Sequence, residues 1–151
     1  MKTVPTPPLD DLRGLHCLTV HQPWAELIVS GRKWAENRTW STHHRGTLGV
    51  HAGRTTPDPD NLALGGLLAD ADLPLGVLVG TVEVVDCLPR GEMNEVDFYG
   101  AAESLLQPHG IDVTAGREFV IDGSPYVWLL ANPVRFETPA PRKGQTLVWR
   151  F

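Results

Sequence analysis

The chain has 151 residues, of which 42% are hydrophobic and 21% are charged, and its formal net charge is −5. This length and composition predict one globular domain with its own core, and no apolar run approaches the length of a membrane span. The acidic balance argues against a protein that coats nucleic acid over its whole surface.

Residues 1–14 are rich in proline and are expected to form a flexible tail, so that residues 15–151 make up a single domain. The first residues contain no apolar signal core. Cys17 and Cys87 lie in apolar segments with no pairing pattern around them, which predicts two reduced thiols in a cytoplasmic protein.

The next segments alternate between strand and helix signals. Residues 15–20 are short, apolar and partly β-branched, which predicts a strand. A helix is expected over residues 23–31, because proline suits the first helical position, apolar residues follow at helical spacing, and glycine suits the end. Residues 34–40 are expected to be extended, with Trp34, Glu36, Arg38 and Trp40 on one face.

Further strands are predicted at residues 47–52, 77–88, 126–131 and 146–151, and helices within residues 61–68 and 98–107. Gly80 is expected to mark a bulge or a close backbone approach, and Asn132-Pro133 to end the strand before it. Together these elements predict an α+β fold: a small, strongly curved sheet or barrel with appended helices.

Charge is distributed unevenly along the chain. Segments 21–54 and 135–151 each have a net charge of +3, whereas segment 55–134 has thirteen acidic residues against two arginines. If the two basic segments meet in the fold, they form a local anion site on an acidic body; otherwise both are solvated surfaces. The acidic segment 55–134 is a candidate protein-binding face.

Residues 21–40 combine charged side chains with three tryptophans. Lys33, Glu36 and Arg38, interleaved with Trp34 and Trp40, suit the recognition of a flat polar ring such as a nucleobase. The same residues also suit an ordinary ion-pair cluster beside a core. The remaining tryptophans, Trp24, Trp128 and Trp149, are predicted to be core residues.

Several chemical roles are open to these side chains. Lys33 is a candidate nucleophile, general base or phosphate contact, and Glu36 a candidate acceptor for a base edge or an acid–base group. Arg38 suits a phosphate or a structural pair with Glu36. Arg45 and His51 are candidate phosphate contacts. We expect neither a metal nor a cofactor, because no cysteine or carboxylate completes a ligand spacing with the histidines.

The spacing of Gly31, Lys33, Glu36 and Arg38 matches the signature Gly-x-Lys-x-x-Glu-x-Arg, and in this the chain closely resembles the ASCH domain family of the PUA-like superfold. The resemblance runs from about residue 15 to residue 151. It includes companion segments in the family's order: Gln22-Pro23-Trp24, Arg45-Gly46 before the His51 strand, Gly80 to Glu83, Trp128 ahead of Asn132-Pro133, and Gly144 to Trp149.

The resemblance implies a small mixed β-barrel of five to six strands with a short first helix and additional covering helices. It also implies a cleft between the first helix and the barrel that binds RNA, DNA or a modified nucleotide. Some family members are enzymes, either ribonucleases or N4-acetylcytidine amidohydrolases, and for such an activity Lys33 and Glu36 are the candidate catalytic residues. Glu36 stands where the amidohydrolases have threonine, which favours binding over catalysis.

Overall fold

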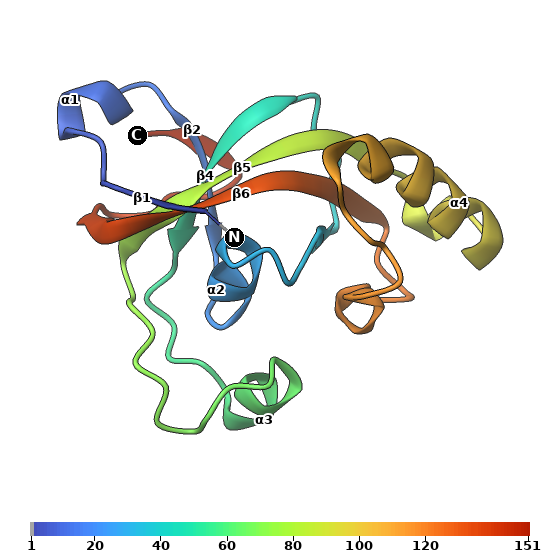
Figure 1. The fold of residues 1–151 in the computed structure, drawn as a ribbon, viewed down its shortest axis with the longest axis horizontal. Coiled ribbons are helices and arrows are strands. Elements are labelled where there is room, and N and C mark those ends of the chain that lie inside the picture. Colours follow the sequence, from blue (N-terminus) through green and yellow to red (C-terminus); the bar gives the residue numbers. More distant parts are fainter. Residues whose placement is uncertain (1) are drawn as a thin grey trace.

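The computed structural model describes residues 2–151, which contain one sheet of seven strands (Figure 1). The strands are β1 (Lys2–Val4), β2 (His16–Val20), β3 (Ala35–Arg38), β4 (Gly46–Ala52), β5 (Val77–Leu88), β6 (Tyr126–Pro141) and β7 (Val148–Arg150). The helices are α1 (Leu9–Leu12), α2 (Trp24–Val29), α3 (Pro59–Leu64) and α4 (Glu95–Leu106). Short 3-10 turns occur at Arg90–Glu92, Gln107–His109 and Arg117–Phe119.

The sheet is mixed, and its strand order is β1-β6-β5-β4-β2-β7, with β3 paired to β6 outside this path. The pairs β4–β5 and β5–β6 are antiparallel, whereas β2–β4 and β1–β6 are parallel. The predicted α+β class is therefore confirmed. The strand path is open rather than closed into a complete barrel, and the sheet contains one strand, β1, that the sequence does not predict.

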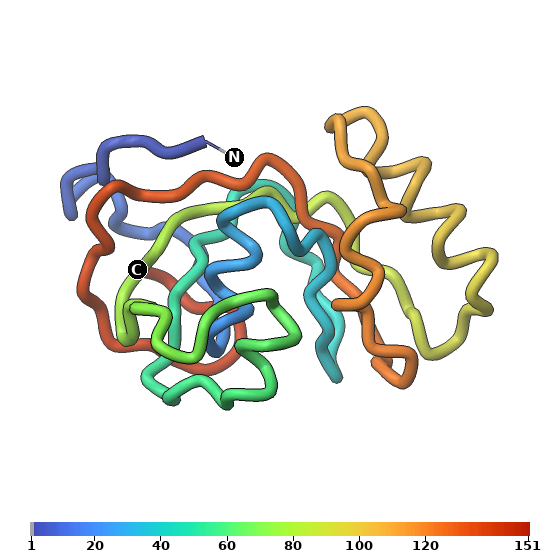
Figure 2. The backbone as a smooth tube through the Cα atoms, turned by 60° about the horizontal axis from the view of Figure 1, so that its bottom comes forward, coloured from blue at the N-terminus to red at the C-terminus, as the bar shows by residue number. Residues whose placement is uncertain are grey.

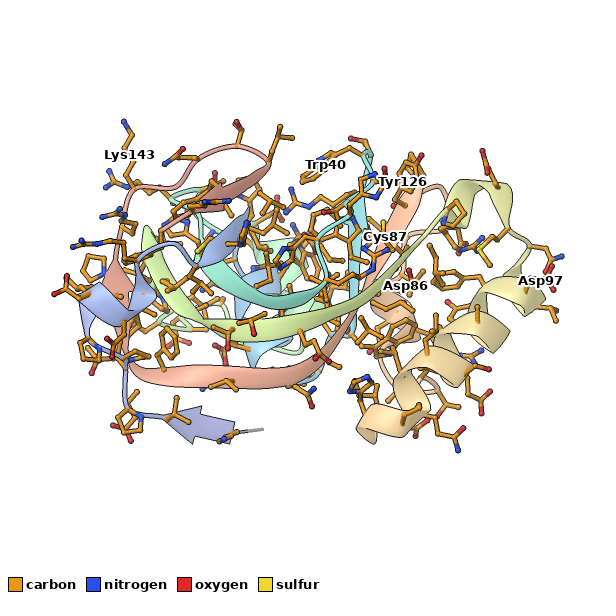
Figure 3. The ribbon with its side chains drawn as sticks, turned by 90° about the horizontal axis from the view of Figure 1, so that it is seen from above. Trp40, Asp86, Cys87, Asp97, Tyr126 and Lys143 are labelled. Carbon is orange, nitrogen blue, oxygen red and sulfur yellow. The ribbon has the colours of Figure 1, made fainter. Side chains whose placement is uncertain are left out.

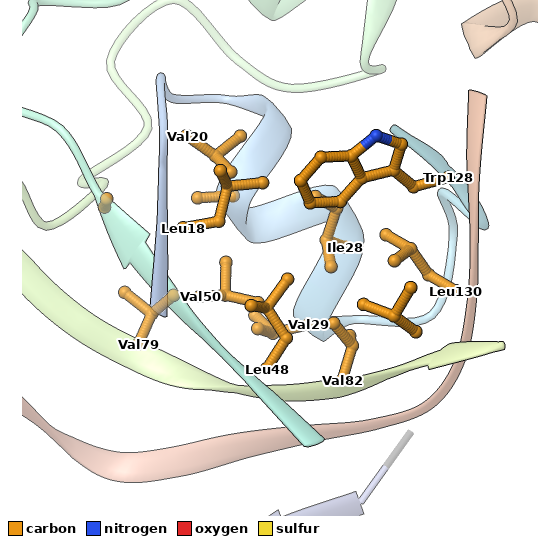
Figure 4. Close-up of a cluster of buried hydrophobic side chains, with 13 residues drawn as sticks. Leu18, Val20, Ile28, Val29, Leu48, Val50, Val79, Val82, Trp128 and Leu130 are labelled. Carbon is orange, nitrogen blue, oxygen red and sulfur yellow. The ribbon is translucent and has the colours of Figure 1, made fainter. Parts of the chain in front are cut away.

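The main core lies inside the curl of the sheet, where α2 packs (Figure 4). Its side chains come from β2, β4, β5, β6 and α2, and the labelled ones point toward one another. Trp128 is fully buried there, and Trp149 is 5% exposed in a second cluster, which confirms both as core residues. The full burial of an apolar side chain stabilises a fold by about 1.5–3 kcal/mol.

The N-terminal segment contacts the sheet, whereas the sequence predicts a flexible tail over residues 1–14. Lys2–Val4 pair in parallel with Val134–Phe136 of β6, because that edge of β6 offers free backbone partners. Leu12 is buried beside Cys17 and Trp149, so the hydrophobic effect also holds the N-terminal segment against the sheet. Met1 lies outside the described residues.

Strand β6 continues through Asn132-Pro133 to Pro141, so the prediction that this dipeptide ends the strand is wrong. Asn132 adopts a φ of 49°, and the register with β5 shifts between Thr81 and Glu83. A proline is tolerated at such an irregularity, where no ladder hydrogen bond is required of it. Gly80 confirms its predicted role, since a Cβ there would lie 1.9 Å from the Val134 carbonyl oxygen.

The turn after α2 directs the chain toward the site. Gly31 has a φ of 82°, a conformation that glycine adopts without a steric penalty, so the predicted helix end is confirmed. The amides of Arg32 and Lys33 both donate to the Leu27 carbonyl. This closed turn sets Lys33 and the start of β3 against the side of α2.

The segment between β5 and β6 is a long excursion from the sheet. It carries α4 to one end of the molecule and returns through residues 117–125, whereas residues 53–76 with α3 lie near α2 (Figure 2). Cys17 and Cys87 are free thiols. Among residues 2–151, no helix combines the length and apolar character required to span a membrane.

Candidate functional site

A cleft of about 890 Å³ lies between the α2 side of the sheet and the returning loop 117–125. Four parts of the chain line it: the end of β2 with the start of α2, the segment 33–40, helix α3, and the loop before β6. The residues that line it include Thr19, His21, Trp24, Lys33, Glu36, Asn37, Arg38, Trp40, Leu64, Glu118, Phe119 and Ile121.

Lys33, Glu36 and Arg38 form one hydrogen-bonded triad in this cleft. Lys33 Nζ donates to Glu36 Oε1 at 2.8 Å and to the Ala35 carbonyl oxygen. Arg38 Nε donates to Glu36 Oε2 at 2.9 Å, and Arg38 Nη2 lies 2.7 Å from the same oxygen. Lys33 is 4% exposed and Glu36 is 6% exposed, so the cation–anion pair is buried.

Backbone pairing fixes the position of the triad. Glu36 lies opposite Trp128 in the antiparallel β3–β6 ladder, which anchors it to the fully buried part of the sheet. Arg38 Nη2 also donates to the Thr19 carbonyl oxygen at 3.0 Å, so the guanidinium links β3 to β2 across the cleft. The triad is therefore part of the fold as well as part of the cleft wall.

The electrostatics of the triad keep Glu36 ionised. Burial alone would raise the pKa of Glu36, but the charges and hydrogen bonds of Lys33 and Arg38 outweigh it and hold the pKa below its ordinary value of 4.5. Glu36 is therefore a carboxylate at neutral pH, and it can accept a hydrogen bond but not donate one.

Aromatic side chains line the same cleft as the triad. Trp24 lines the cleft and packs edge-on against Phe119, with ring centroids 6.0 Å apart. Trp40 lines it too and packs edge-on against the buried Trp128 at 4.9 Å, which fixes the orientation of the Trp40 indole. These rings provide apolar faces on which a planar ligand can stack.

The structure exchanges two of the tryptophan roles predicted from the sequence. Trp24, expected in the core, packs against the main core and also lines the cleft, whereas Trp34, a candidate ligand contact, does not line it. Trp34 is 4% exposed in the cluster that packs against α4, and its indole N–H donates to the Ala115 carbonyl oxygen at 2.7 Å. Trp34 lies just before β3 and Trp40 just after it, and of the two only Trp40 lines the cleft.

Asn37 connects β3 to the loop on the far side of the cleft, a role that sequence analysis misses. Its side-chain amide donates to the Phe119 carbonyl oxygen at 2.8 Å and accepts from the Ile121 amide at 3.0 Å. A polar residue inside the signature segment was the available signal. Because the contact spans more than eighty residues of sequence, local patterns do not reveal the partner.

Comparison with known proteins identifies the family. The family model described as "ASCH domain" matches residues 18–140. The chain belongs to the ASCH domain family.

This ASCH domain is similar to curated proteins named "Activating signal cointegrator 1". The human protein is 33% identical over 148 residues, covering 91% of this chain and 22% of that protein. The mouse protein is 31% identical with the same coverage. The chain thus spans about a fifth of the length of these relatives.

Among solved structures, the crystal structure of ASCH from Zymomonas mobilis resembles this chain with a TM-score of 0.46 at 15% identity. That match covers 85% of this chain and 74% of the other. A crystal structure of a point mutant of the same bacterial protein gives a TM-score of 0.46 at 14% identity, covering 85% of this chain and 76% of the other.

Arg45 and His51 do not line the cleft of the ASCH domain. Arg45 is exposed and bonds Asp86 Oδ1 at 3.0 Å, on the outer side of β5. His51 is 1% exposed, and its ring bonds the Arg142 carbonyl oxygen at 2.6 Å and Thr19 Oγ1 at 3.2 Å. Burial lowers the pKa of His51, and nearby Arg54 lowers it further, although the bond to Arg142 opposes them.

The two basic segments do meet, around Gly76. A Cβ on Gly76 would lie 3.1 Å from Arg54 Nε, and the Arg142 amide donates to the Gly76 carbonyl oxygen. Lys143 follows in the chain and lies at the end of the molecule opposite Asp97 of α4, with Trp40 between them along the length of the protein (Figure 3). Within residues 2–151, Arg54, Arg142 and Lys143 form no salt bridge.

The acidic segment 55–134 divides between two regions. Leu64 of α3 and the loop 117–125 contribute to the cleft, whereas α4, with exposed Asp97, lies at the far end (Figure 3). No group of three or more histidine, cysteine or acidic side chains able to hold a metal ion occurs in the described part of the chain.

Proposed function

We propose that this ASCH domain binds single-stranded RNA or DNA, or a modified nucleotide, by inserting one base into the cleft. The observation that carries the proposal is that the hydrogen-bonded Lys33–Glu36–Arg38 triad lines the same cleft as the Trp24, Trp40 and Phe119 rings. A polar floor provides hydrogen bonds to a base edge, and aromatic walls provide stacking.

The charged side chains inside the cleft are balanced, whereas other cations lie near its rim. Inside the cleft, the cations of Lys33 and Arg38 are balanced by the carboxylates of Glu36 and Glu118. Arg54 lies next to Gly53, whose Cβ position is 3.2 Å from the His21 ring at the cleft rim. We infer that the base enters the balanced cleft, while Arg54 and neighbouring cations contact the phosphate backbone.

The geometry favours binding over the enzymatic alternative. A general acid–base group works best with a pKa near the working pH. The pKa of Glu36 lies below its ordinary value of 4.5 and is therefore shifted away from neutral pH. Lys33 Nζ is also engaged by two acceptors, which restrains it as a nucleophile. Incubation with N4-acetylcytidine or RNA should therefore give no product whose formation depends on Lys33.

The cytoplasmic location and a protein contact through segment 55–134 are predictions from the sequence. The relatives' name, "Activating signal cointegrator 1", suggests a part in an activating signal, and it extends to this chain only as a proposal, because the chain corresponds to about a fifth of their length.

Fluorescence anisotropy with labelled single-stranded oligonucleotides at low salt tests the proposed function. We expect saturable binding that weakens as salt increases, and an Arg38→Ala variant that binds at least about tenfold more weakly. The matched control is Arg13→Ala, an exposed arginine of the N-terminal segment, which should bind as wild type. Circular dichroism checks that both variants are folded. Absence of wild-type binding, or equal loss in both variants, rejects the proposal.

A further inference from the structure

The triad does not use all of its hydrogen-bonding capacity. The Lys33 ammonium has three N–H groups, and among the described residues it bonds only the Ala35 carbonyl oxygen and Glu36 Oε1. One Lys33 donor therefore remains for a ligand in the cleft that Lys33 lines.

Glu36 and Arg38 also retain capacity. Glu36 Oε2 accepts from Arg38 Nε and lies 2.7 Å from Arg38 Nη2, whereas Oε1 receives one bond, from Lys33, and so has room to accept another. Arg38 uses Nε and Nη2 within residues 2–151, and Nη1 makes no hydrogen bond to any of these residues. The Arg38 side chain is 24% exposed, which leaves it accessible to a ligand.

Taken across the triad, the open positions run in the order donor, acceptor, donor: Lys33, Glu36, Arg38. A matching ligand edge must present acceptor, donor, acceptor. The imide edge of uracil and thymine has this order, with a carbonyl oxygen on each side of the N3–H group. Its two oxygens would face cationic donors, and its N–H would face a carboxylate, so all three hydrogen bonds would be charge-assisted.

The other common bases fit the triad less well. Cytosine presents an amino group where a second acceptor is required, which would face a lysine or arginine donor. Adenine likewise presents an amino group, and guanine adds one beside its N1–H group. Each mismatch leaves buried donors facing each other without an acceptor, a situation that a desolvated site penalises strongly.

The rims of the cleft fit an uncharged ring. Leu64 on α3 and Ile121 in the returning loop both line the cleft, and they are 53% and 60% exposed. Exposed apolar side chains at the opening of a cleft are suited to cover the faces of a planar ligand and to exclude water from its polar edge.

We propose that the cleft selects the imide edge of uracil or thymine. This inference rests on the proposed function, because it assigns the base that occupies the same cleft.

Binding of four labelled oligonucleotides of equal length, measured by anisotropy at one salt concentration, tests this inference. They are oligo-dT, oligo-dC, oligo-dA, and an oligo-dT in which each thymine carries a methyl group on N3. The methyl group removes the imide donor and leaves the backbone and the ring system in place. We expect oligo-dT to bind roughly 10- to 100-fold more tightly than the other three.

The outcomes separate this inference from the proposed function. Equal binding of oligo-dT and its N3-methyl form, weakened in both by Arg38→Ala, overturns imide selection and leaves nucleic-acid binding in place. Tighter binding of oligo-dC or oligo-dA also overturns it. Absence of binding by all four overturns both. Since the decisive comparison changes the ligand and not the protein, no folding defect of a variant can obscure it.

Discussion

Lys33 and Glu36 form a 2.8 Å ion pair in a setting where both side chains are more than nine-tenths buried. Removing one partner of such a pair leaves an uncompensated buried charge, which destabilises more than the pair itself stabilises. The proposed function assigns ligand recognition to the same contacts that stabilise this ASCH domain, so experiments must separate the two effects.

Glu36→Gln should lower the free energy of unfolding by about 3 kcal/mol, because Lys33 loses its anionic partner in a buried position. Urea denaturation followed by tryptophan fluorescence measures the change. Glu103→Gln, at an exposed position of α4, is the matched control and should change stability by less than about 0.5 kcal/mol. Similar losses in both variants would contradict the assigned role of the buried pair.

Acid should destabilise the wild type partly through Glu36. Because its pKa in the folded state lies below the ordinary value of 4.5, ionised Glu36 contributes stability above that pH, and this contribution is lost as pH falls through the folded pKa. Urea midpoints between pH 7 and pH 3 should therefore fall less steeply in Glu36→Gln than in wild type. Parallel curves for the two proteins would show that the pKa of Glu36 is not lowered in the folded state.

His51 should produce a second pH effect in a higher range. Burial lowers its folded pKa below 6.5, so the neutral ring is favoured, and stability is lost as pH falls from 6.5 toward the folded pKa. The wild-type unfolding midpoint should drop between pH 7 and pH 5 by more than that of His51→Gln. If the two proteins lose stability equally over this range, the titrating group lies elsewhere.

Trp40→Leu and Trp34→Leu should have opposite phenotypes. Trp40 lines the cleft, so its replacement should weaken oligonucleotide binding by about 1–3 kcal/mol, the value of stacking one base. Trp34 is buried away from the cleft, so its replacement should lower the unfolding free energy by about 2–4 kcal/mol and leave the affinity of the folded fraction nearly unchanged. Anisotropy and urea denaturation on both variants distinguish these outcomes.

Asn37→Ala should release the far wall of the cleft. Its side chain makes two hydrogen bonds to the backbone of residues 119–121, and their loss should destabilise this contact by about 1–3 kcal/mol. Hydrogen exchange at the Ile121 amide should accelerate, while the amides of the β5–β6 ladder serve as an internal reference. Unchanged exchange at Ile121 would show that other contacts hold the loop.

Local patterns in the sequence predicted much of the fold. The strand at residues 77–88 has the predicted bounds, and the helix ending before Gly31 is confirmed. Both elements have strong local signals. The strand is rich in β-branched residues, and the helix is followed by a glycine that suits its end. The sequence does not predict β1, because Lys2–Val4 form a strand only by pairing with the edge of β6. No local pattern reveals this distant partner.

The candidate site was predicted in part for the same reason. Lys33, Glu36 and Arg38 follow each other closely in sequence, and the structure brings them together. The opposite wall, with Phe119 and Ile121, comes from distant sequence and carries no motif. Arg45 and His51 are predicted to contact phosphate, whereas tertiary contacts direct them to Asp86 and to the Arg142 carbonyl oxygen.

The segment between β5 and β6 leaves the sheet and returns to it at a single residue pair, since Leu88 of β5 pairs with Val127 of β6. The register of the two strands therefore does not depend on the length of segment 89–125, whereas its composition is constrained where Phe98 of α4 packs in the same buried cluster as Trp34. That segment carries one wall of the cleft, and the triad comes from the scaffold. The exposed positions of this loop can thus change the shape of the cleft opening while the Lys33–Glu36–Arg38 triad stays constant.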